Sequence, residues 1–317
     1  LSGREITLSE HVATVRDAAE YLFGAADKPT RLGKEWVRFF RIYPSRFRDF
    51  LLNLNLAAIF HDLGKANDGF QKAIRKEGTQ AIRHEHLSAL LLYSEPMRTW
   101  LSGHGSLGVD VEIVIAAVLS HHLKANDAEF GKRLEPGLES FRVFTRAPEF
   151  LDCLDMASEV LGDKTSDLSS FDRQWSFETD VDPHKGRQGE FSRAMHSFKK
   201  DLVQNENRRR LLVAVKAGLL AADSAGSALV REGQSLRDWI SLCFGNDPLT
   251  PDWIDAKVIA PRIKEVEKRS GQTFKWHDFQ KAADDLGERA LLLSGCGTGK
   301  TLAAWRWIRS QLGRRSA

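Results

Sequence analysis

The chain has 317 residues, of which 42% are hydrophobic and 28% are charged, with a net charge of +3. These values are ordinary for a soluble globular protein of one or two domains, and so small a charge excludes any argument for a nucleic-acid partner from net charge alone. Its apolar runs stay well short of the roughly 18 residues that a membrane-spanning helix needs, and its 3 cysteines are widely separated. We therefore expect a cytoplasmic protein with neither a membrane segment nor a disulfide or thiolate-zinc framework.

The first predicted element is a helix over residues 7–22. It starts with a capping box, in which Thr7 caps the helix and Glu10 reaches back. Apolar residues then recur at helical spacing. His11 lies in the first turn of this helix, and a single histidine there is more often a surface residue than a ligand.

Residues 28–48 combine basic and aromatic side chains, and only Glu35 opposes the positive charges. The cations are Lys28, Arg31, Lys34, Arg38, Arg41, Arg46 and Arg48, and the rings are Trp36, Phe39, Phe40, Tyr43 and Phe47. Such interleaving suits a single nucleic-acid strand, with cations on phosphates and rings under bases. An amphipathic helix that buries its aromatics is an equally good explanation. If the first holds, Lys34, Arg38 and Arg41 are candidate DNA contacts.

The central motif is an apolar run, Leu56–Phe60, that leads directly into His61-Asp62-Leu63-Gly64-Lys65. Imidazole and carboxylate together suit a transition metal. Neighbouring helical positions point about 100° apart, so His61 and Asp62 can share a metal only if other ligands surround it. Lys65 lies one turn after His61, where an ammonium can meet a phosphate. A partly exposed helix end is the alternative.

Further candidate ligands follow at the ends of apolar helices. His84 and His86 compete for one role, and we prefer His84 because the small Ser88, four residues later, allows a neighbouring backbone to approach. A strongly apolar helix over 111–119 ends in His121 and His122, although histidines at a helix C-terminus also interact well with its dipole.

Downstream of these histidines, residues 171–185 are expected to form a surface loop. The cluster Arg208-Arg209-Arg210 is better explained by solvent than by phosphate. Asp223 closes an apolar run, and a carboxylate there is costly to bury unless it is paired or coordinates a metal. It is therefore the last candidate ligand.

Beyond residue 245 the pattern changes. Residues 246–262 contain several prolines and are expected to be a linker. A strand over 290–293, a glycine-rich loop over 294–299 and a helix over 302–312 are then predicted around a phosphate loop. Strand, loop and helix in this order place backbone N–H groups around phosphates. The candidate nucleotide ligands of the loop are Gly297, Gly299, Lys300 and Thr301.

The candidate ligands form the set His11, His61, Asp62, His84, His121, His122 and Asp223. Seven nitrogen and oxygen donors suffice for two metals, and a carboxylate such as Asp62 can bridge them. Histidine-rich sites favour Mn, Fe, Co, Ni or Zn over Mg. The predicted chemistry is metal-assisted phosphoester hydrolysis.

This ordered set, with Lys65 and the tandem histidines, resembles the HD superfamily of metal-dependent phosphohydrolases. Together with the phosphate loop, it resembles the nuclease-helicase of type I CRISPR systems over the whole chain. The resemblance implies a mainly α-helical HD nuclease domain over 1–245, the linker over 246–262, and the first part of an α/β RecA-like helicase domain over 263–317. The chain is then expected to be a piece of a longer protein, without the remaining helicase motifs needed to hydrolyse ATP.

The same resemblance assigns roles to residues. It implies one metal on His11, His61, Asp62 and Asp223, and a second on Asp62, His84, His121 and His122, with Asp62 and Lys65 catalytic. Gln280 resembles an adenine-reading glutamine, and ATP with Mg would serve the full-length helicase. The implied partners are single-stranded DNA and an RNA-guided surveillance complex. Two alternatives stay open: a hydrolase of nucleotides or cyclic nucleotides, and a non-catalytic binding module.

Overall fold

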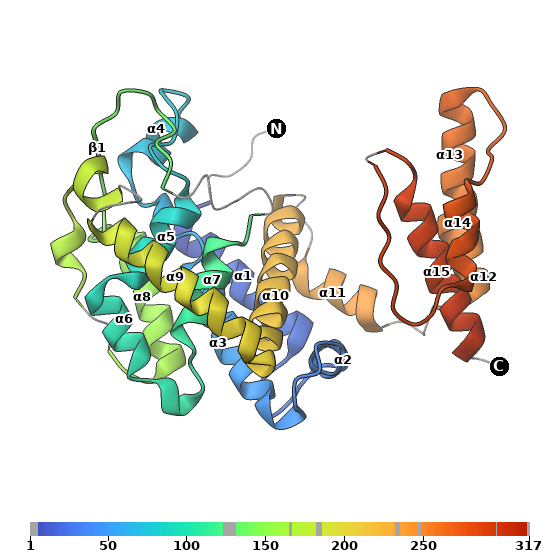
Figure 1. Cartoon of the computed structure of the whole chain (residues 1–317), viewed down its shortest axis with the longest axis horizontal. Coiled ribbons are helices and arrows are strands. Elements are labelled where there is room, and N and C mark those ends of the chain that lie inside the picture. The colour runs from blue at the N-terminus through green and yellow to red at the C-terminus, as the bar shows by residue number, and fades with distance from the viewer. Residues whose placement is uncertain are drawn as a thin grey trace. The chain divides into compact units, whose positions relative to one another are not determined.

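The computed structural model describes residues 6–122, 131–164, 167–181, 186–231, 235–245, 249–295 and 297–315. The chain divides into two compact units, Leu1–Gly245 and Asn246–Ala317, which we describe separately. Both are mainly helical, as Figure 1 shows. None of the helices in the described ranges combines the length and the apolar character needed to cross a lipid bilayer.

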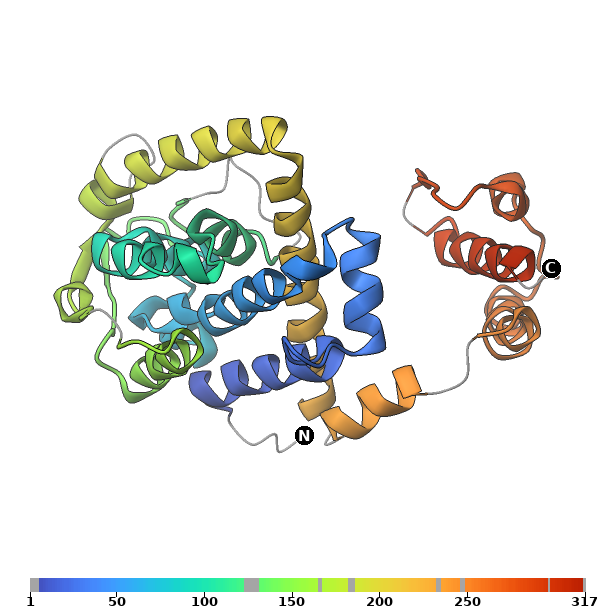
Figure 2. The same cartoon turned by 90° about the horizontal axis from the view of Figure 1, so that it is seen from below.

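The core of the first unit is formed by four helices that pack against one another: α1 (Leu8–Phe23), α3 (Phe47–Phe60), α7 (Val111–Leu119) and α10 (Glu206–Arg231). Figure 2 shows α3 and α10 passing through the middle of this unit. Around them lie α2 (Arg31–Phe39), α4 (Asp68–Ile74), α5 (His84–Tyr93), α6 (Glu95–Ser102), α8 (Pro148–Leu161), α9 (Gly186–Gln204) and α11 (Leu236–Gly245).

Local sequence explains how the core helices begin and how closely they pack. Thr7 and Glu10 form the expected capping box at the start of α1. Where α10 crosses α1, a Cβ on Gly226 would lie 3.3 Å from the Cα of Val15, so a small residue allows the two backbones to approach. Six of the nine residues of α7 are buried, which accounts for its nearly continuous apolar sequence.

The expected surface loop over 171–185 is wrong in its described part, 171–181. Gln174–Ser176 (β2) pairs antiparallel with Ser140–Arg142 (β1), with Phe141 opposite Trp175. The Trp175 side chain is fully buried, and its indole N–H donates to the carbonyl of Phe171 (3.1 Å). The scattered polar residues of this segment suggested a loop, but its large aromatic side chains are buried and hold it against the core. Residues 182–185 lie outside the described ranges.

The second unit contains α12 (Pro251–Ile254), α13 (Ala260–Ser270), α14 (Asp278–Ala282) and α15 (Lys300–Arg315). The expected linker over 246–262 is therefore wrong from residue 251 onward, and residues 246–248 lie outside the described ranges. Pro251 occupies the first turn of α12, where proline costs no hydrogen bond, and Pro261 lies just after the π-helical turn Asp255–Ile259 inside a continuous helical run. The Thr250 side chain caps α12 by accepting from the N–H of Trp253 (3.1 Å).

The expected strand over 290–293 is also absent from the described part of this unit. Residues 290–295 adopt no regular structure, and the side chains of Leu291 and Leu293 are each 82% exposed. A parallel strand needs neighbouring strands and helices on both faces, which the described residues of this unit do not provide. Among the residues of this unit that the structure describes, the helices are formed and a RecA-like sheet is not.

Candidate metal centre

The centre begins where α3 ends, because the apolar run carries the chain into the core. His61 is the C-cap of α3, and its backbone N–H donates to the carbonyl of Ala57 (2.9 Å). The turn Leu63–Lys65 follows Asp62. The side chains of His61 and Asp62 are 0% and 2% exposed. Groups of this kind need partners when they are buried, so the neighbouring helices decide what the pair can do.

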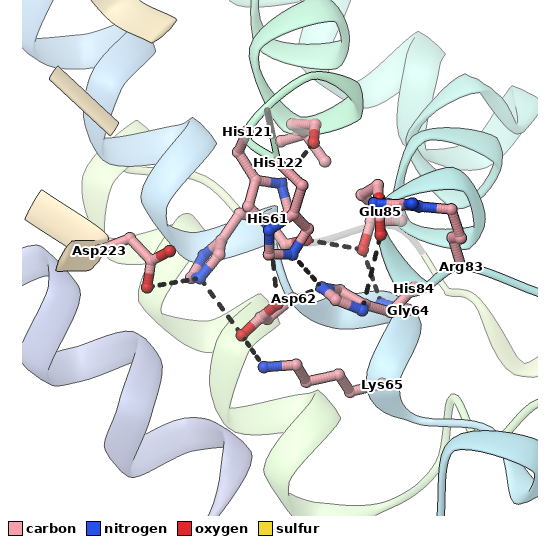
Figure 3. Close-up of polar contacts among 12 residues, drawn as sticks. His61, Asp62, Gly64, Lys65, Arg83, His84, Glu85, His121, His122 and Asp223 are labelled. Carbon is pink, nitrogen blue, oxygen red and sulfur yellow. Dashed lines mark hydrogen bonds and ion pairs between the residues drawn. The ribbon is translucent and has the colours of Figure 1, made fainter. Parts of the chain in front are cut away.

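Gly64 brings α5 against this turn, as the close-up in Figure 3 shows. A Cβ on Gly64 would lie 2.0 Å from the carbonyl oxygen of His84, so the two backbones are in direct contact. The Ser88 hydroxyl accepts from the N–H of Gly64 (2.7 Å) and donates to the carbonyl of His61 (3.0 Å). This contact fixes the first turn of α5, and with it the position of His84.

The two oxygens of Asp62 face two different groups of histidines. Oδ2 lies 3.1 Å from Nε2 of His11 and 3.3 Å from Nε2 of His61, and it also accepts from Lys65 Nζ. Oδ1 lies 3.1 Å from Nε2 of His84 and 4.0 Å from Nε2 of His121. One carboxylate therefore joins ligands that come from α1, α3, α5 and the end of α7.

Two further residues complete the groups. Asp223, on α10, places Oδ1 3.6 Å from Nε2 of His11 and 3.9 Å from Nε2 of His61. Its carboxylate is oriented by the Ser227 hydroxyl (3.0 Å). On the other side, Nε2 of His122 lies 3.0 Å from Nε2 of His84. The structure thus brings all seven candidate ligands to one place.

The orientation of the rings fits a metal site. Nδ1 of His61 faces the carbonyl of Ala58 (2.8 Å), and Nδ1 of His121 faces the carbonyl of Val118 (2.6 Å). A carbonyl accepts only from N–H, so the proton of each neutral ring lies on Nδ1 and the Nε2 lone pair points into the centre. Nε2 of His121 is buried without any hydrogen-bond partner in the described structure. Such an orphaned acceptor is costly unless a cation binds it.

The electrostatics keep several donors unprotonated. Burial lowers the pKa of His121 to about 3 and also lowers that of His122. Burial would raise the pKa of Asp62, but His61 and the hydrogen bonds from the surrounding imidazoles hold it well below its usual range. Burial would lower the pKa of His61, yet the adjacent Asp62 carboxylate outweighs it and raises this pKa. Asp62 is therefore ionised at neutral pH, as a metal ligand must be.

Two ligand triplets are close enough to hold one ion each. In one triplet, His84, His121 and His122 place their donor atoms within 4.8 Å of one another, and His11, His61 and Asp62 do so in the other. The donor set of imidazole nitrogens and carboxylate oxygens suits Mn, Fe, Co, Ni or Zn. Two metals that share a carboxylate can stabilise both the attacking and the leaving oxygen of a phosphoester.

Comparison with known proteins identifies the family of this centre. Residues 2–227 match the family described as "Cas3, HD domain". The chain belongs to the Cas3 HD-domain family. Over 320 aligned residues it is also 30% identical to a protein of Myxococcus xanthus named as the CRISPR-associated nuclease/helicase Cas3. That alignment covers 97% of this chain but 39% of the relative, so the chain spans well under half of the relative's length.

In this member of the Cas3 HD-domain family, His84 and not His86 faces Asp62. His86 lies on another side of α5, where its Nδ1 accepts from the N–H of Gly131 (3.2 Å). It borders a cavity of about 760 Å³ that is lined mostly by apolar side chains of α7, α9 and α10. Burial lowers the pKa of His86 to about 4. The face of the helix therefore places His84, and not His86, beside the Asp62 carboxylate.

Two residues that support the centre were missed by sequence reasoning. Glu85 is 1% exposed, pairs with Arg83, and places Oε2 3.6 Å from Nδ1 of His84. Asn67 is fully buried, donates to the carbonyl of Gly64 (2.6 Å) and accepts from the N–H of Phe70 (2.9 Å) as the cap of α4. The only signal in the sequence was their position beside the histidines and the glycine.

The candidate DNA contacts Lys34, Arg38 and Arg41 lie away from these ligands, on α2 and the turn after it. All three are exposed, and Arg38 pairs with Glu35 (3.3 Å).

The phosphate loop lies in the second unit, at the start of α15. Gly297 and Gly299 have φ of +78° and +84°, a conformation that glycine adopts without strain. The Lys300 ammonium donates to the carbonyls of Ser294 (2.8 Å) and Gly295 (2.6 Å), and Thr301 is exposed. Cys296 lies outside the described residues.

Gln280 reaches this loop from α14. Its amide nitrogen donates to the carbonyl of Gly299 (3.0 Å), and its amide oxygen accepts from the N–H of His277 (3.0 Å). Gln280 is 1% exposed, so its side chain links α14 to the loop from a buried position. An adenine-reading role would require it to exchange at least one of these bonds.

Proposed function

We propose that the chain is a metal-dependent nuclease that hydrolyses phosphodiester bonds of single-stranded DNA, as the nuclease part of a CRISPR-associated nuclease-helicase. The observation that carries this proposal is the carboxylate of Asp62, whose two oxygens face two separate groups of imidazoles. The Asp62 carboxylate needs partners because it is buried; the Lys65 ammonium pairs with Oδ2, whereas Oδ1 lies 3.1 Å from Nε2 of His84. It is well suited to bridging two ions.

This geometry supports the following assignment of ligands. One ion would be held by His11, His61, Asp62 and Asp223, and the other by Asp62, His84, His121 and His122. Bound transition metals supply an activated water and stabilise the charge that develops on a phosphodiester.

The role of Lys65 follows from its exposure and its partner. The Lys65 side chain is 29% exposed, whereas the side chain of its partner Asp62 is 2% exposed. The ammonium therefore contacts the centre and is also accessible to solvent. It also lies 5.6 Å from the ring centre of Phe70. We assign to Lys65 the contact with the scissile phosphate, because an ammonium on a flexible stem binds phosphate as a point charge.

The remaining assignments concern a longer protein. The phosphate loop and Gln280 support binding of ATP with Mg by a complete helicase domain, which would feed the strand to the nuclease unit. Recognition of an RNA-guided surveillance complex, and a cytoplasmic location, belong to the same proposal. They rest on the relative's name and on the order of motifs, since the chain spans 39% of that relative.

The test is cleavage of circular single-stranded DNA by metal-stripped protein, with Mn, Ni or Mg added back in the absence of ATP. Cutting with a transition metal is expected, and a circular substrate shows that the enzyme needs no strand end. Metal uptake without any cutting would favour a hydrolase of small nucleotides instead. Failure to take up any metal would favour a binding module.

A further inference from the structure

Two large aromatic side chains protrude from the surface at α2 and the turn that follows it. The residue Phe39 is 70% exposed and Tyr43 is 64% exposed. Single exposed hydrophobic residues are common on proteins. Phe39 is the last residue of α2, and Tyr43 follows four residues later as the N-cap of the short helix Pro44–Arg46, so the two form a local feature.

The neighbouring aromatics of the same stretch have a different role. Trp36 packs its ring 5.0 Å from that of Phe23 and donates its indole N–H to the carbonyl of Ala214 (3.2 Å). Phe40 packs 5.3 Å from Trp36, and Phe47 is buried. The two explanations offered by the sequence therefore apply to different residues: three rings anchor α2 to the core, and two remain outside.

The exposed rings lie among cations. Arg31, Lys34 and Arg38 are exposed at helical spacing on α2, and Arg41 and Arg48 are exposed beyond it. Two acids oppose the cations of this region, and each pairs with a near neighbour: Glu35 with Arg38 (3.3 Å) and Asp49 with Arg46 (2.7 Å). The surface therefore keeps an excess of positive charge beside the two rings. A polyanion is the partner that this charge fits.

Arg41 adds an unusual backbone. Its φ is +55°, at the C-terminal end of α2 where glycine or asparagine is normally found. A non-glycine residue in this conformation carries strain, and such strain clusters at functional sites. The Arg41 carbonyl is held by Nη1 of Arg210 (3.3 Å). An exposed arginine thus occupies a position whose backbone conformation glycine or asparagine would adopt with less strain.

We propose that α2 and residues 40–43 form a strand-binding surface, in which Phe39 and Tyr43 stack on unpaired bases while Lys34, Arg38 and Arg41 hold the backbone phosphates. Aromatic rings with cations at their sides are the usual platform for single-stranded nucleic acid, because every base offers a face for stacking. This proposal deepens the proposed nuclease function and rests on it for the identity of the strand.

The distance from this surface to the metal centre can be estimated along two helices, α10 and α1, that reach from one to the other. On α10, Arg210 contacts the turn and Asp223 lies 13 residues further on; on α1, Phe23 packs beside α2 and His11 lies 12 residues back. At 1.5 Å per residue, both paths give roughly 18–20 Å. Stacked nucleotides advance about 3.4 Å each, so about five or six would span this distance. The surface therefore acts on strands and not on single nucleotides.

The test is binding of a fluorescent thymidine strand of about 20 nucleotides, longer than common site sizes, to the metal-stripped chain in chelator. Phe39→Ala with Tyr43→Ala should weaken binding by about five- to a hundred-fold per lost base contact. Leu151→Ala is the control, because this side chain is 45% exposed on α8 and far from any cation cluster in sequence. Binding of the same sequence as a duplex should change little, since paired bases cannot stack on the rings.

A second variant separates binding from folding. Arg41→Gly relieves the positive φ and should leave the melting temperature unchanged or higher, while it weakens strand binding and reduces the salt dependence by about one phosphate contact. A merely structural Arg41 would give the opposite pattern, with lower thermal stability and normal binding. Equal losses on single strands and duplexes would overturn the stacking assignment, and normal strand binding by both variants would overturn the whole proposal.

The proposed nuclease function can fail separately. Thymidine 5′-p-nitrophenyl phosphate, a diester too small to reach the strand-binding surface, should be cleaved equally by the wild type and by the Phe39→Ala, Tyr43→Ala protein when metal is present. Cleavage of this diester with unchanged strand affinity would reject the surface alone. Strand binding by the wild type without cleavage of any diester would reject the nuclease function alone.

Discussion

Asp62 is shared by the two groups of candidate ligands, since each of its oxygens faces one group. We predict that Asp62→Ala abolishes uptake of both ions at micromolar metal and abolishes cleavage, while strand binding in chelator stays normal. Metal uptake measured by calorimetry, with Asp152→Ala as an exposed-carboxylate control on α8, checks this. If the variant still bound two ions, Asp62 would not be the bridge.

Gly64 determines whether α5 can approach the histidine-aspartate turn. In Gly64→Ala the new methyl group would lie 2.0 Å from the His84 carbonyl, so α5 must shift. Overpacking of this kind costs about 1–3 kcal/mol, or roughly 2–12 °C in melting temperature for a unit of this size. The displaced His84 should also weaken metal binding.

Gly105→Ala is the matched control for this substitution, because a Cβ at Gly105 would meet nothing within 4 Å. Thermal denaturation and metal titration of both variants provide the comparison. Equal stability and equal metal affinity of the two variants would show that the contact between Gly64 and α5 is not needed.

At the scale of elements, Arg208 ties the start of α10 to the start of α7. Its guanidinium donates to both oxygens of Asp110 (2.6 and 2.7 Å), to Glu112 (2.9 Å) and to Asp201 (2.8 Å). Asp110 also caps α7. The sequence interpretation of the arginine cluster as solvated is therefore wrong for this member, which is 24% exposed in its side chain.

We predict that Arg208→Ala lowers the free energy of unfolding by about 1–3 kcal/mol, because charge-assisted hydrogen bonds are lost and two helix starts separate. Arg209→Ala is the natural control, since the Arg209 guanidinium donates to the Leu202 carbonyl (3.2 Å) at an exposed position. Urea unfolding of the two variants measures the difference. A loss as large for Arg209→Ala would show that Arg208 has no special role.

Whether an element could be predicted depended on how local its signal was. The helix over 111–119 was predicted to the residue because its apolar run is bounded by Asp110, a capping residue, and by Ser120. The strand over 290–293 was predicted from an equally apolar run, but a strand is completed only by partners elsewhere in the chain. The prolines of 251–261 could not be distinguished from linker prolines, because the same residue type begins helices and fills loops.

The candidate ligands could be named from the sequence because buried histidines and aspartates are rare at the ends of apolar helices. The family resemblance supplied their division into two groups that share Asp62, whereas the distances between the donor atoms could not be predicted. The sequence left His84 and His86 open, since the choice depends on the face of α5 that meets Gly64. The burial of Glu85 beside His84 likewise arises only when α5 and its neighbours pack together.

At the scale of the whole molecule, the candidate ligands belong to α1, the end of α3, α5, the end of α7 and α10, so bound ions would link five segments of the first unit. We predict that a transition metal at about 100 times its dissociation constant adds roughly 2.7 kcal/mol of stability. For a unit of this size this corresponds to a melting temperature about 5–10 °C higher. The gain should appear equally in a chain ending at residue 245, because every candidate ligand lies before that residue.

The pH dependence of this gain has a definite sign. The pKa of His61 is raised in the metal-free fold, because Asp62 outweighs the effect of burial. Its protonated form therefore stabilises the metal-free protein at low pH, and that stabilisation is lost as pH rises through the raised pKa. Metal binding requires the same imidazole to be neutral, so protons compete with the metal in the same range. The metal-induced rise in melting temperature should accordingly grow as pH increases from mildly acidic to mildly alkaline. A rise that is constant across this range in calorimetric scans would mean that the metal does not bind at His61.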